Sequence, residues 1–291
     1  MKHTRYLALL SSLSDNDPTA CRHCASTSLI RFGAQNGRQR FRCKDCLKTC
    51  CATTGTPLAR LSKKYELAGY AECLAKGLTL RHISEALKMS LDRAFRWRHR
   101  MLALPIGHQP RSIKGILEVD ETHFKISRKG QRGLGTAARK RAGRAAHKGR
   151  FCSDFIPVLV GRARGQPFTV DKAMASMAKE EIFEALKGSV DHAMTVLCMD
   201  SRKSFLEMGK MLGVATNIFV TTKAKPVDFH VQNVNSCHER LKTWIDYRLR
   251  GVASKYMPSY LAWERLRTWN AQEMSSGELI SCALGRQLIN L

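Results

Sequence analysis

From residue 115 onward, apolar stretches of strand length alternate with stretches whose apolar residues recur at helical spacing. The strand-like stretches have alternating or continuous apolar residues and are bounded by Gly, Pro or Asp. Strands are predicted at 116–126, 154–161, 166–170, 193–199 and 216–221. Helices are predicted at 176–188, 204–212 and 231–248. Three strands are thus followed by helix, strand, helix, strand and helix, an order that predicts an α/β domain over 115–269.

The segment 60–104 has apolar residues at helical spacing only. Ser62 is a candidate cap for a helix that ends at Gly77, and Thr79 is a candidate cap for the next helix. A short break at Met89-Ser90 precedes a third helix over 91–102. Two short helices around a tight break predict a helix-turn-helix domain.

The third helix of that segment carries arginines on one face, at Arg93, Arg96 and Arg100. Arginines in this arrangement suit phosphates or guanine edges in the major groove of DNA. The alternative is a three-helix bundle whose arginines are solvated. Trp97 lies among them and is expected to pack rather than to stack on bases.

Four of the eleven cysteines form two pairs with metal-ligand spacing. Cys21 and Cys24 are separated by two residues, as are Cys43 and Cys46, and eighteen residues lie between the pairs. This spacing is typical of a four-thiolate zinc site. The intervening residues can form one β-hairpin with a turn at Asn36-Gly37, so a zinc ribbon is predicted over 18–53. The alternative is two reduced cysteine pairs without metal.

The balance of charges narrows the class of partner. The 291 residues carry 49 Lys and Arg against 24 Asp and Glu, a formal net charge of +25. A chain this basic is expected to act on a polyanion, nucleic acid first. An apolar content of 44% excludes a wholly disordered chain, and no apolar run is long enough to cross a membrane. No small-residue cleavage site follows the apolar start, so no signal peptide is expected.

The basic residues are densest at 125–150, where ten Lys and Arg occur without an acidic residue. This stretch falls between the first two predicted strands of the α/β domain. We expect an arm that binds the DNA backbone in a salt-dependent way, with Arg139, Lys140 and Arg141 at its centre.

Carboxylates occur at positions suited to metal chemistry. Glu118 and Asp120 share one face of the first predicted strand, and Asp200 ends the fourth. Asn235, Glu239 and Lys242 share one face of the last helix. In a ribonuclease H-like domain, such groups converge and can hold two Mg²⁺ ions. Taken singly, the same residues could be a strand-end cap, half of an ion pair and a surface amide.

Several of these stretches together resemble the Merlin-related DDE transposases of bacterial insertion sequences, which have an ISXO-like catalytic domain. The likeness covers roughly residues 18–268. The matching stretches, in chain order, are Cys43–Cys46, Thr54–Arg60, Phe95–His99, Glu118–Thr122, Val196–Asp200, Asn233–Asn235 with Leu241-Lys242, and Gly251–Tyr256. The resemblance implies a multidomain chain with a small β zinc ribbon, an α-helical helix-turn-helix, and an α/β ribonuclease H-like domain.

The resemblance also implies roles for the site residues. Asp120 matches the first catalytic acid and Asp200 the second, while Lys242 matches the family's lysine and would contact a phosphate near the cut end. The third acid of the family falls on Asn235, so an amide replaces the usual Glu. Glu239, one turn further on, is the alternative third ligand. The implied cofactors are a structural Zn²⁺ and a catalytic Mg²⁺ or Mn²⁺ at Asp120, Asp200 and Asn235.

The implied activity is cleavage of phosphodiester bonds at the ends of an insertion sequence and joining of the 3′-hydroxyl ends to target DNA. The implied partners are double-stranded DNA, as terminal inverted repeats and target, and further copies of the chain as a dimer or larger assembly. A bacterial cytoplasmic protein associated with the nucleoid is expected. The alternatives are an inactive or domesticated DNA-binding regulator and a structural RNA-binding zinc ribbon protein. Residues 270–291 are expected to be a C-terminal tail.

Overall fold

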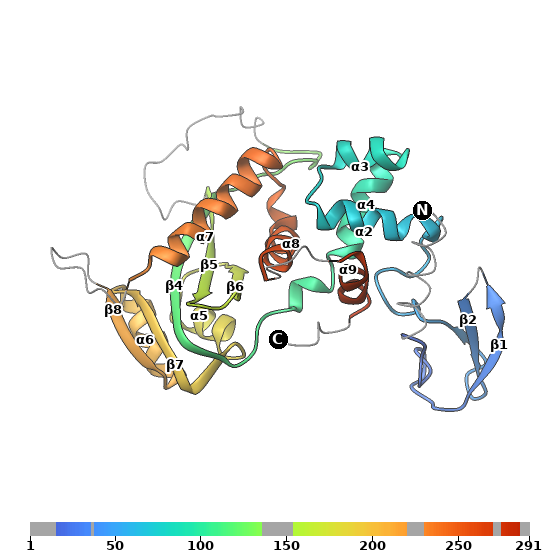
Figure 1. Cartoon of the computed structure of the whole chain (residues 1–291), viewed down its shortest axis with the longest axis horizontal. Coiled ribbons are helices and arrows are strands. Elements are labelled where there is room, and N and C mark those ends of the chain that lie inside the picture. Colours follow the sequence, from blue (N-terminus) through green and yellow to red (C-terminus); the bar gives the residue numbers. More distant parts are fainter. Residues whose placement is uncertain (1–15, 36–37, 136–153, 220–229, 270–274, 286–291) are drawn as a thin grey trace. The chain divides into compact units, whose positions relative to one another are not determined.

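A computed structural model describes residues 16–35, 38–135, 154–219, 230–269 and 275–285 of the chain (Figure 1). The chain divides into two compact units: residues 1–108 with 272–291, and residues 109–271. Among the described residues, no helix combines the length and the apolar character that crossing a lipid bilayer requires.

The first unit begins with a small antiparallel sheet. Strands β1 (Leu29–Gln35) and β2 (Arg38–Cys43) form the predicted hairpin, whose Asn36-Gly37 turn lies outside the described residues. A short third strand, β3 (Thr49–Cys50), pairs with β2 and was not predicted. Two residues are too few to give a period-two pattern, so the sequence carries no signal for this strand.

The rest of the first unit is helical. Its elements are η1 (Lys64–Glu66), α2 (Leu67–Ala75), α3 (Leu80–Leu87), α4 (Leu91–Met101), η2 (Pro105–Gly107) and α9 (Ser276–Ala283). The predicted cap at Ser62 was wrong, because Lys63 has a left-handed backbone (φ 50°) and the helix begins only after it, with Glu66 as N-cap. The two later helices begin where they were predicted. Helix α9 begins with a capping box at Ser275 and contacts α2 and α4.

The second unit is built on a mixed five-stranded sheet in the order β6-β5-β4-β7-β8. The strands are β4 (Ile113–Lys125), β5 (Phe155–Ala163), β6 (Thr169–Ala173), β7 (Val190–Asp200) and β8 (Ala215–Phe219). Strand β4 is central: it pairs antiparallel with β5 and parallel with β7. The first strand of the unit therefore lies between the second and the fourth, and its side chains meet those of both neighbours.

Three predicted helices of the second unit are present with shifted ends: α5 (Lys179–Leu186), α6 (Lys203–Leu212) and α7 (Gln232–Lys242), which continues into the π-helical turn η3 (Thr243–Arg248). Two further helices, η4 (Ser254–Tyr256) and α8 (Met257–Trp269), were not predicted. The predicted helix over 231–248 is therefore α7 followed by η3. The third strand extends to Ala173, because buried Asp171 is paired with Arg265 of α8.

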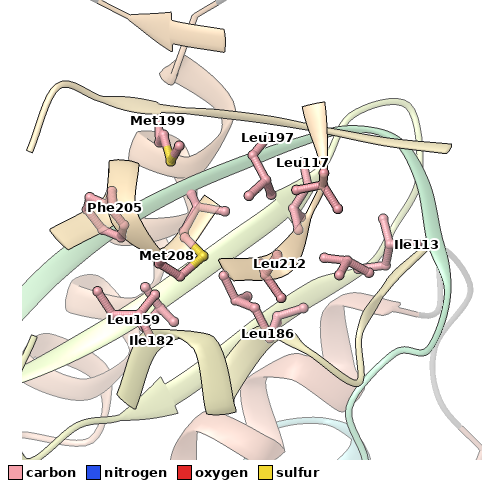
Figure 2. Packing of buried hydrophobic residues seen from close by; sticks show 14 of the residues in the cluster. Ile113, Leu117, Leu159, Ile182, Leu186, Leu197, Met199, Phe205, Met208 and Leu212 are labelled. Atoms are coloured by element: carbon pink, nitrogen blue, oxygen red, sulfur yellow. The ribbon is translucent and has the colours of Figure 1, made fainter. Parts of the chain in front are cut away.

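One face of this sheet is a hydrophobic layer against α5 and α6 (Figure 2). Leu117 and Val119 of β4 and Leu197 and Met199 of β7 point into it, where they meet Phe205 and Met208 among others. Strand side chains alternate between faces. The residues between these apolar ones, Glu118 and Asp120 on β4 and Cys198 and Asp200 on β7, therefore lie on the other face, which α7 contacts.

Candidate active site and metal centre

The four predicted zinc ligands gather at one point in the first unit. The sulfur of Cys21 lies 3.6 Å from that of Cys46, and the sulfur of Cys24 lies 3.6 Å from that of Cys43. All four sulfurs lie within 4.8 Å of one another. Four thiolates at about 2.3 Å from a tetrahedral zinc ion would be spaced by just under 4 Å. The donor set and its spacing therefore fit Zn²⁺.

The two halves of this centre have the same local backbone. The N–H of Cys21 donates to the carbonyl of Ser26 at 2.7 Å, and the N–H of Cys43 donates to that of Lys48 at 3.0 Å, five residues on in both cases. The residue after the second cysteine is left-handed in both halves, Ala25 at φ 60° and Leu47 at φ 58°. A left-handed backbone is costly for residues other than glycine. Its occurrence twice at the same place shows that both cysteine pairs use the same turn to bring two sulfurs together.

Backbone amides also prepare one thiol of the centre for ionisation. A hydrogen bond from the backbone N–H of Cys46 lowers the pKa of Cys43 to about 6, and further bonds from Asp45 and the neighbouring thiols act in the same direction. Metal binding requires thiolates. The fold therefore supplies part of the stabilisation of the ligand's charged form before a metal ion binds.

Helices α3 and α4 are joined by the predicted tight break. The hydroxyl of Thr79 accepts from the N–H of His82, and that of Ser90 accepts from the N–H of Arg93, so each helix starts with a side-chain cap. Lys88 makes the turn with a left-handed backbone. Trp97 is buried and packs edge-to-face against Tyr70 with ring centroids 5.5 Å apart, as predicted.

The three arginines predicted to read DNA have different surroundings. Arg96 is the most exposed and pairs with the equally exposed Asp92 one turn earlier. Arg93 pairs with Glu66 at 3.2 Å, and Arg100 donates to the carbonyl of Ala59 at 2.9 Å. Arg98, which the sequence analysis did not single out, is buried and donates to the carbonyl of Leu78. The structure therefore leaves Arg96 as the most accessible side chain of this face.

In the second unit, the register of β4 and β7 sets the two predicted catalytic aspartates side by side. Glu118 of β4 is opposite Cys198 of β7 in a parallel pair. Asp120 and Asp200 lie two residues further on in both strands, so they occupy neighbouring strands at the same level and on the same face. Both side chains are partly exposed. Adjacent strands are about 4.8 Å apart, which suits two carboxylates that share a cation.

Glu118 shares a face of β4 with Asp120, but its carboxylate makes its contacts with the start of α7 and with Arg164. Its carboxylate is fully buried and accepts hydrogen bonds from the backbone N–H of Asn233 at 2.9 Å and of Val234 at 3.2 Å. It also accepts from the side-chain amide of Asn233 and, twice, from the guanidinium of Arg164. The backbone N–H groups of Asn233 and Val234 belong to the first turn of α7, where they have no partner within the helix. Glu118 therefore fixes the start of α7 to the central strand, and we call this group the Glu118 clamp.

The clamp determines which side chains of α7 face the aspartates. On one side of the helix, Cys237, Arg240 and Leu241 line a small cavity with Val160 of β5 and Asp171 of β6. Successive residues of an α-helix are about 100° apart, so Asn235 and Lys242 lie within about 20° of each other, on the edge away from that cavity. Asn235 is exposed on that edge and Lys242 is partly exposed. Glu239 is about 40° further round, is 75% exposed and pairs with Lys242 at 3.3 Å.

His238 is a further residue beside Asp120 that the sequence did not reveal. It is 6% exposed and shares a hydrogen bond with the backbone of Asp120. Burial lowers its pKa to about 4, and the charges of Lys242 and His123 act in the same direction. Its ring is therefore neutral at pH 7. The only sequence signal for it was its position among the buried residues of α7, at i+4 from Val234 and i−3 from Leu241.

Glu121 points to the opposite face of β4 from Asp120. It pairs with Arg202, just past the end of β7, and the N–H of Arg202 donates to the carboxylate of Asp200 at 3.1 Å. Arg202 thus contacts both carboxylates. Glu121 positions this turn and does not reach the face that carries the two aspartates.

The centre of the basic stretch, with Arg139, Lys140 and Arg141, lies outside the described residues. The residues at its root are held in place. Lys125 pairs with Phe155, and the N–H of Ile126 donates to the carbonyl of Asp154. Ser127 and Ser254 exchange two hydrogen bonds of 2.8 Å.

The chain resembles one protein from a transposable element. It is 28% identical over 160 residues to an uncharacterized protein in transposable element ISH50 of Halobacterium salinarum. The similar region covers 54% of this chain and 53% of that protein, so it spans about half the length of the relative. A comparison with known protein families found none that matches the chain.

Solved structures give only distant likenesses. A chain in the simian T-cell lymphotropic virus intasome in complex with a PP2A regulatory subunit is 11% identical, with a TM-score of 0.33 over 72% of this chain and 73% of that one. A chain of a pre-cleavage Mos1 transpososome is 12% identical, with a TM-score of 0.25 over 79% and 82%. Scores at this level carry no weight for the fold or function of this chain.

Proposed function

We propose that this protein is the DNA transposase of an insertion sequence, with a ribonuclease H-like catalytic domain in its second unit. One observation carries the proposal: Glu118 of β4 is opposite Cys198 of β7 on the face that α7 contacts, and Asp120 and Asp200 each follow two positions later on their adjacent strands. We infer that the two aspartates lie side by side and that Asn235 and Lys242 of α7 complete the site. The sheet order, with the first strand between the second and the fourth, supports it. So does the sequence likeness to a protein in a transposable element.

The donor set of this face suits a hard cation. Two carboxylates and an amide oxygen are ligands that Mg²⁺ or Mn²⁺ prefers. When bound, the metal would supply activation of a water or 3′-hydroxyl and stabilisation of the leaving oxygen. Asp120, Asp200 and Asn235 would hold it. Glu239, about 40° further round the helix, is the weaker candidate, because its carboxylate is already paired with Lys242.

The other residues act on the DNA. Lys242, partly exposed on the same edge as Asn235, would bind a phosphate of the cut end as a point charge. The ribbon would be held by Zn²⁺ at its four cysteines. Arg96 of α4 and the basic stretch with Arg139, Lys140 and Arg141 would bind the duplex. Joining two ends requires both in one complex, so a dimer or larger assembly on DNA is part of the proposal.

The test is a cleavage and joining assay on a labelled duplex that carries the inverted repeat flanking the gene, with Mg²⁺ or Mn²⁺. The wild type should nick at the repeat end and join it to target DNA, and Asp120→Ala should do neither. Asn235→Ala should lose activity and Glu239→Ala should retain it. Tight binding of the repeat without cleavage in either metal would contradict the proposal and favour a DNA-binding regulator.

A further inference from the structure

The small sheet of the first unit has two chemically different faces. In the β1–β2 register, Ile30 is opposite Arg42, and Arg31 is opposite Phe41. A bulge follows between Arg31 and Ala34, where Gly33 takes a left-handed backbone (φ 66°), so that Phe32 lies beside Arg40. Ile30, Phe32, Arg40 and Arg42 therefore share one face, which we call the Phe32 face. Arg31 and Phe41 point to the other.

The Phe32 face combines exposed apolar groups with arginines. Ile30 is 41% exposed and Phe32 is 42% exposed. The guanidinium carbon of Arg40 lies 5.6 Å from the centre of the Phe32 ring, and that of Arg42 lies 5.4 Å from it. Two guanidinium groups therefore flank one accessible aromatic ring. Cation–π contacts of this kind hold the arginines in place. The Nε of Arg42 donates to the carbonyl of Leu47 at 3.4 Å, and the terminal N–H groups of its guanidinium remain to meet a ligand.

Charge indicates what this face binds. Residues 16–53 contain seven Lys and Arg and two Asp, so the ribbon keeps a net positive charge even when four thiolates and one Zn²⁺ contribute about −2. Arg40 and Arg42 have no ion pair with any carboxylate in the described part of the chain. Arginines bind phosphate through paired N–H groups, and aromatic rings stack on bases or pack on sugars.

We infer that the Phe32 face is a second DNA-binding surface, separate from the arginines of α4. Arg40 and Arg42 bind adjacent backbone phosphates, and the Phe32 ring packs against the sugar or base between them. This inference rests on the proposed function for the choice of DNA, but it does not depend on catalysis. A surface on the ribbon would extend the length of DNA that the first unit contacts beyond the site of α4.

The test is the binding of full-length, zinc-loaded protein to a labelled duplex across a salt series, measured by fluorescence anisotropy. The double variant Arg40→Gln, Arg42→Gln should reduce the slope of log K against log salt by about two. Phe32→Ala should weaken binding by about fivefold or more and leave the slope unchanged. Arg31→Gln is the matched control, because it removes one charge from the opposite face of the same hairpin, and it should leave both unchanged.

Three outcomes would overturn the inference. In the first, Arg31→Gln reduces the slope as much per charge as the double variant does, which would show that only net charge matters. In the second, Phe32→Ala changes the oligomeric state in mass photometry while the DNA affinity stays constant, which would show that the face is a protein interface. In the third, the protein binds an RNA of the same sequence more tightly than the DNA, which would make RNA the ligand of this face.

Two measurements keep the test clear of other failures. Zinc content by chromogenic release reports whether each variant is folded, and Phe32→Leu, which keeps apolar bulk without the aromatic ring, replaces Phe32→Ala if the latter loses zinc. Affinity is read without cleavage. Loss of cleavage in Asp120→Ala with these binding effects intact, or the reverse, therefore separates the proposed function from this inference.

Discussion

At the scale of single residues, Glu118 shows how a buried charge can organise a site without taking part in its chemistry. The carboxylate is removed from water, and the guanidinium of Arg164 with the first amides of α7 compensates for the loss. One residue separates Glu118 from Asp120, and one separates Asn233 from Asn235. The clamp therefore aligns the strand that carries one proposed ligand with the helix that carries another.

Removing this carboxylate should be strongly destabilising. We expect Glu118→Ala to lower the free energy of unfolding by about 3 kcal/mol or more, because Arg164 and the helix amides lose their partner. Glu118→Gln, which keeps one acceptor oxygen, should cost less. Urea unfolding gives the free energy, and hydrogen exchange at Asn233 and Val234 locates the change.

The matched control is Glu184→Ala, which breaks the exposed pair with Lys187. Its effect should stay within about 1 kcal/mol. Equal losses in the two variants, or unchanged exchange at the start of α7, would show that Glu118 does not hold the helix.

His238 should make the stability of the second unit dependent on pH. Burial lowers its folded pKa to about 4, whereas an unfolded histidine titrates near 6.5. Between these values the unfolded chain binds a proton that the folded chain does not. The contribution of His238 to the free energy of unfolding is therefore complete above about pH 6.5 and is lost as the pH falls toward 4.

From pH 7 to pH 5, the wild type should lose about 2 kcal/mol more of its free energy of unfolding than His238→Gln, measured by urea unfolding without added metal. The carboxylates titrate in both proteins and cancel in the comparison. His192→Gln, at an exposed position, should follow the wild type. A variant at position 238 with the same pH dependence as the wild type would place the histidine in water.

At the scale of elements, the ribbon contrasts with the sheet of the second unit. No residue of β1 is buried, and Cys43 is the only buried residue of β2. So little burial cannot hold a hairpin in place. The metal must therefore supply most of the folding free energy of this element.

Zinc removal should consequently unfold the ribbon and leave the second unit folded. After chelation, or in Cys43→Ser, amide exchange across β1 and β2 should rise to the rate of an unstructured chain. The amides of β4 and β7, which have their own core, should stay protected. Hydrogen exchange with mass spectrometry measures both. A hairpin that remains protected without metal would contradict the assignment of its stability to the four thiolates.

The sequence pattern was sufficient for the type and order of most elements, because each has a clear hydrophobic period. It predicted α4 and β7 to within a few residues, and the cysteine spacing predicted which sulfurs gather. Boundaries failed where a long-range partner decides them. Asp171 lies inside β6, which pairs with β5 as far as Ala173, and the charge of its buried carboxylate is balanced by Arg265, 94 residues later.

The site was predicted less completely than the fold. The position of Asp120 followed from the alternation of the first strand and that of Asp200 from the end of the fourth, but the roles of Glu118 and His238 depend on where α7 packs. That packing arises from contacts between residues more than a hundred positions apart, such as Glu118 with Asn233. No local spacing reports such a contact. The preference for Asn235 over Glu239 as the third ligand stays a prediction from the sequence.

At the scale of the whole molecule, the net charge of +25 is unevenly distributed, and the stretch at 132–150 holds seven Lys and Arg without an acid. The β4–β5 pairing runs to Lys125 and Phe155, and the N–H of Ile126 donates to the carbonyl of Asp154, so the ladder is complete without that stretch. The sheet therefore does not need this stretch for its own pairing.

Replacing residues 132–150 by a short Gly-Ser linker should leave thermal unfolding of the second unit nearly unchanged. It should lower the slope of log K against log salt for duplex DNA by up to about six, because each phosphate contact contributes close to one. Anisotropy titrations at several salt concentrations give this slope. A linker of the same length with the seven charges retained is the control, and equal slopes for the two proteins would show that the stretch does not contact DNA.

The repeated backbone of the two cysteine pairs has a consequence for kinetics. Each half is complete within six residues, Cys21 to Ser26 and Cys43 to Lys48, and presents two sulfurs without help from the other. An incoming ion can therefore be captured first by either half. The second half then arrives by closure of the intervening hairpin, which is fast compared with the encounter of an ion in dilute solution, so the first capture should set the rate of metal loading.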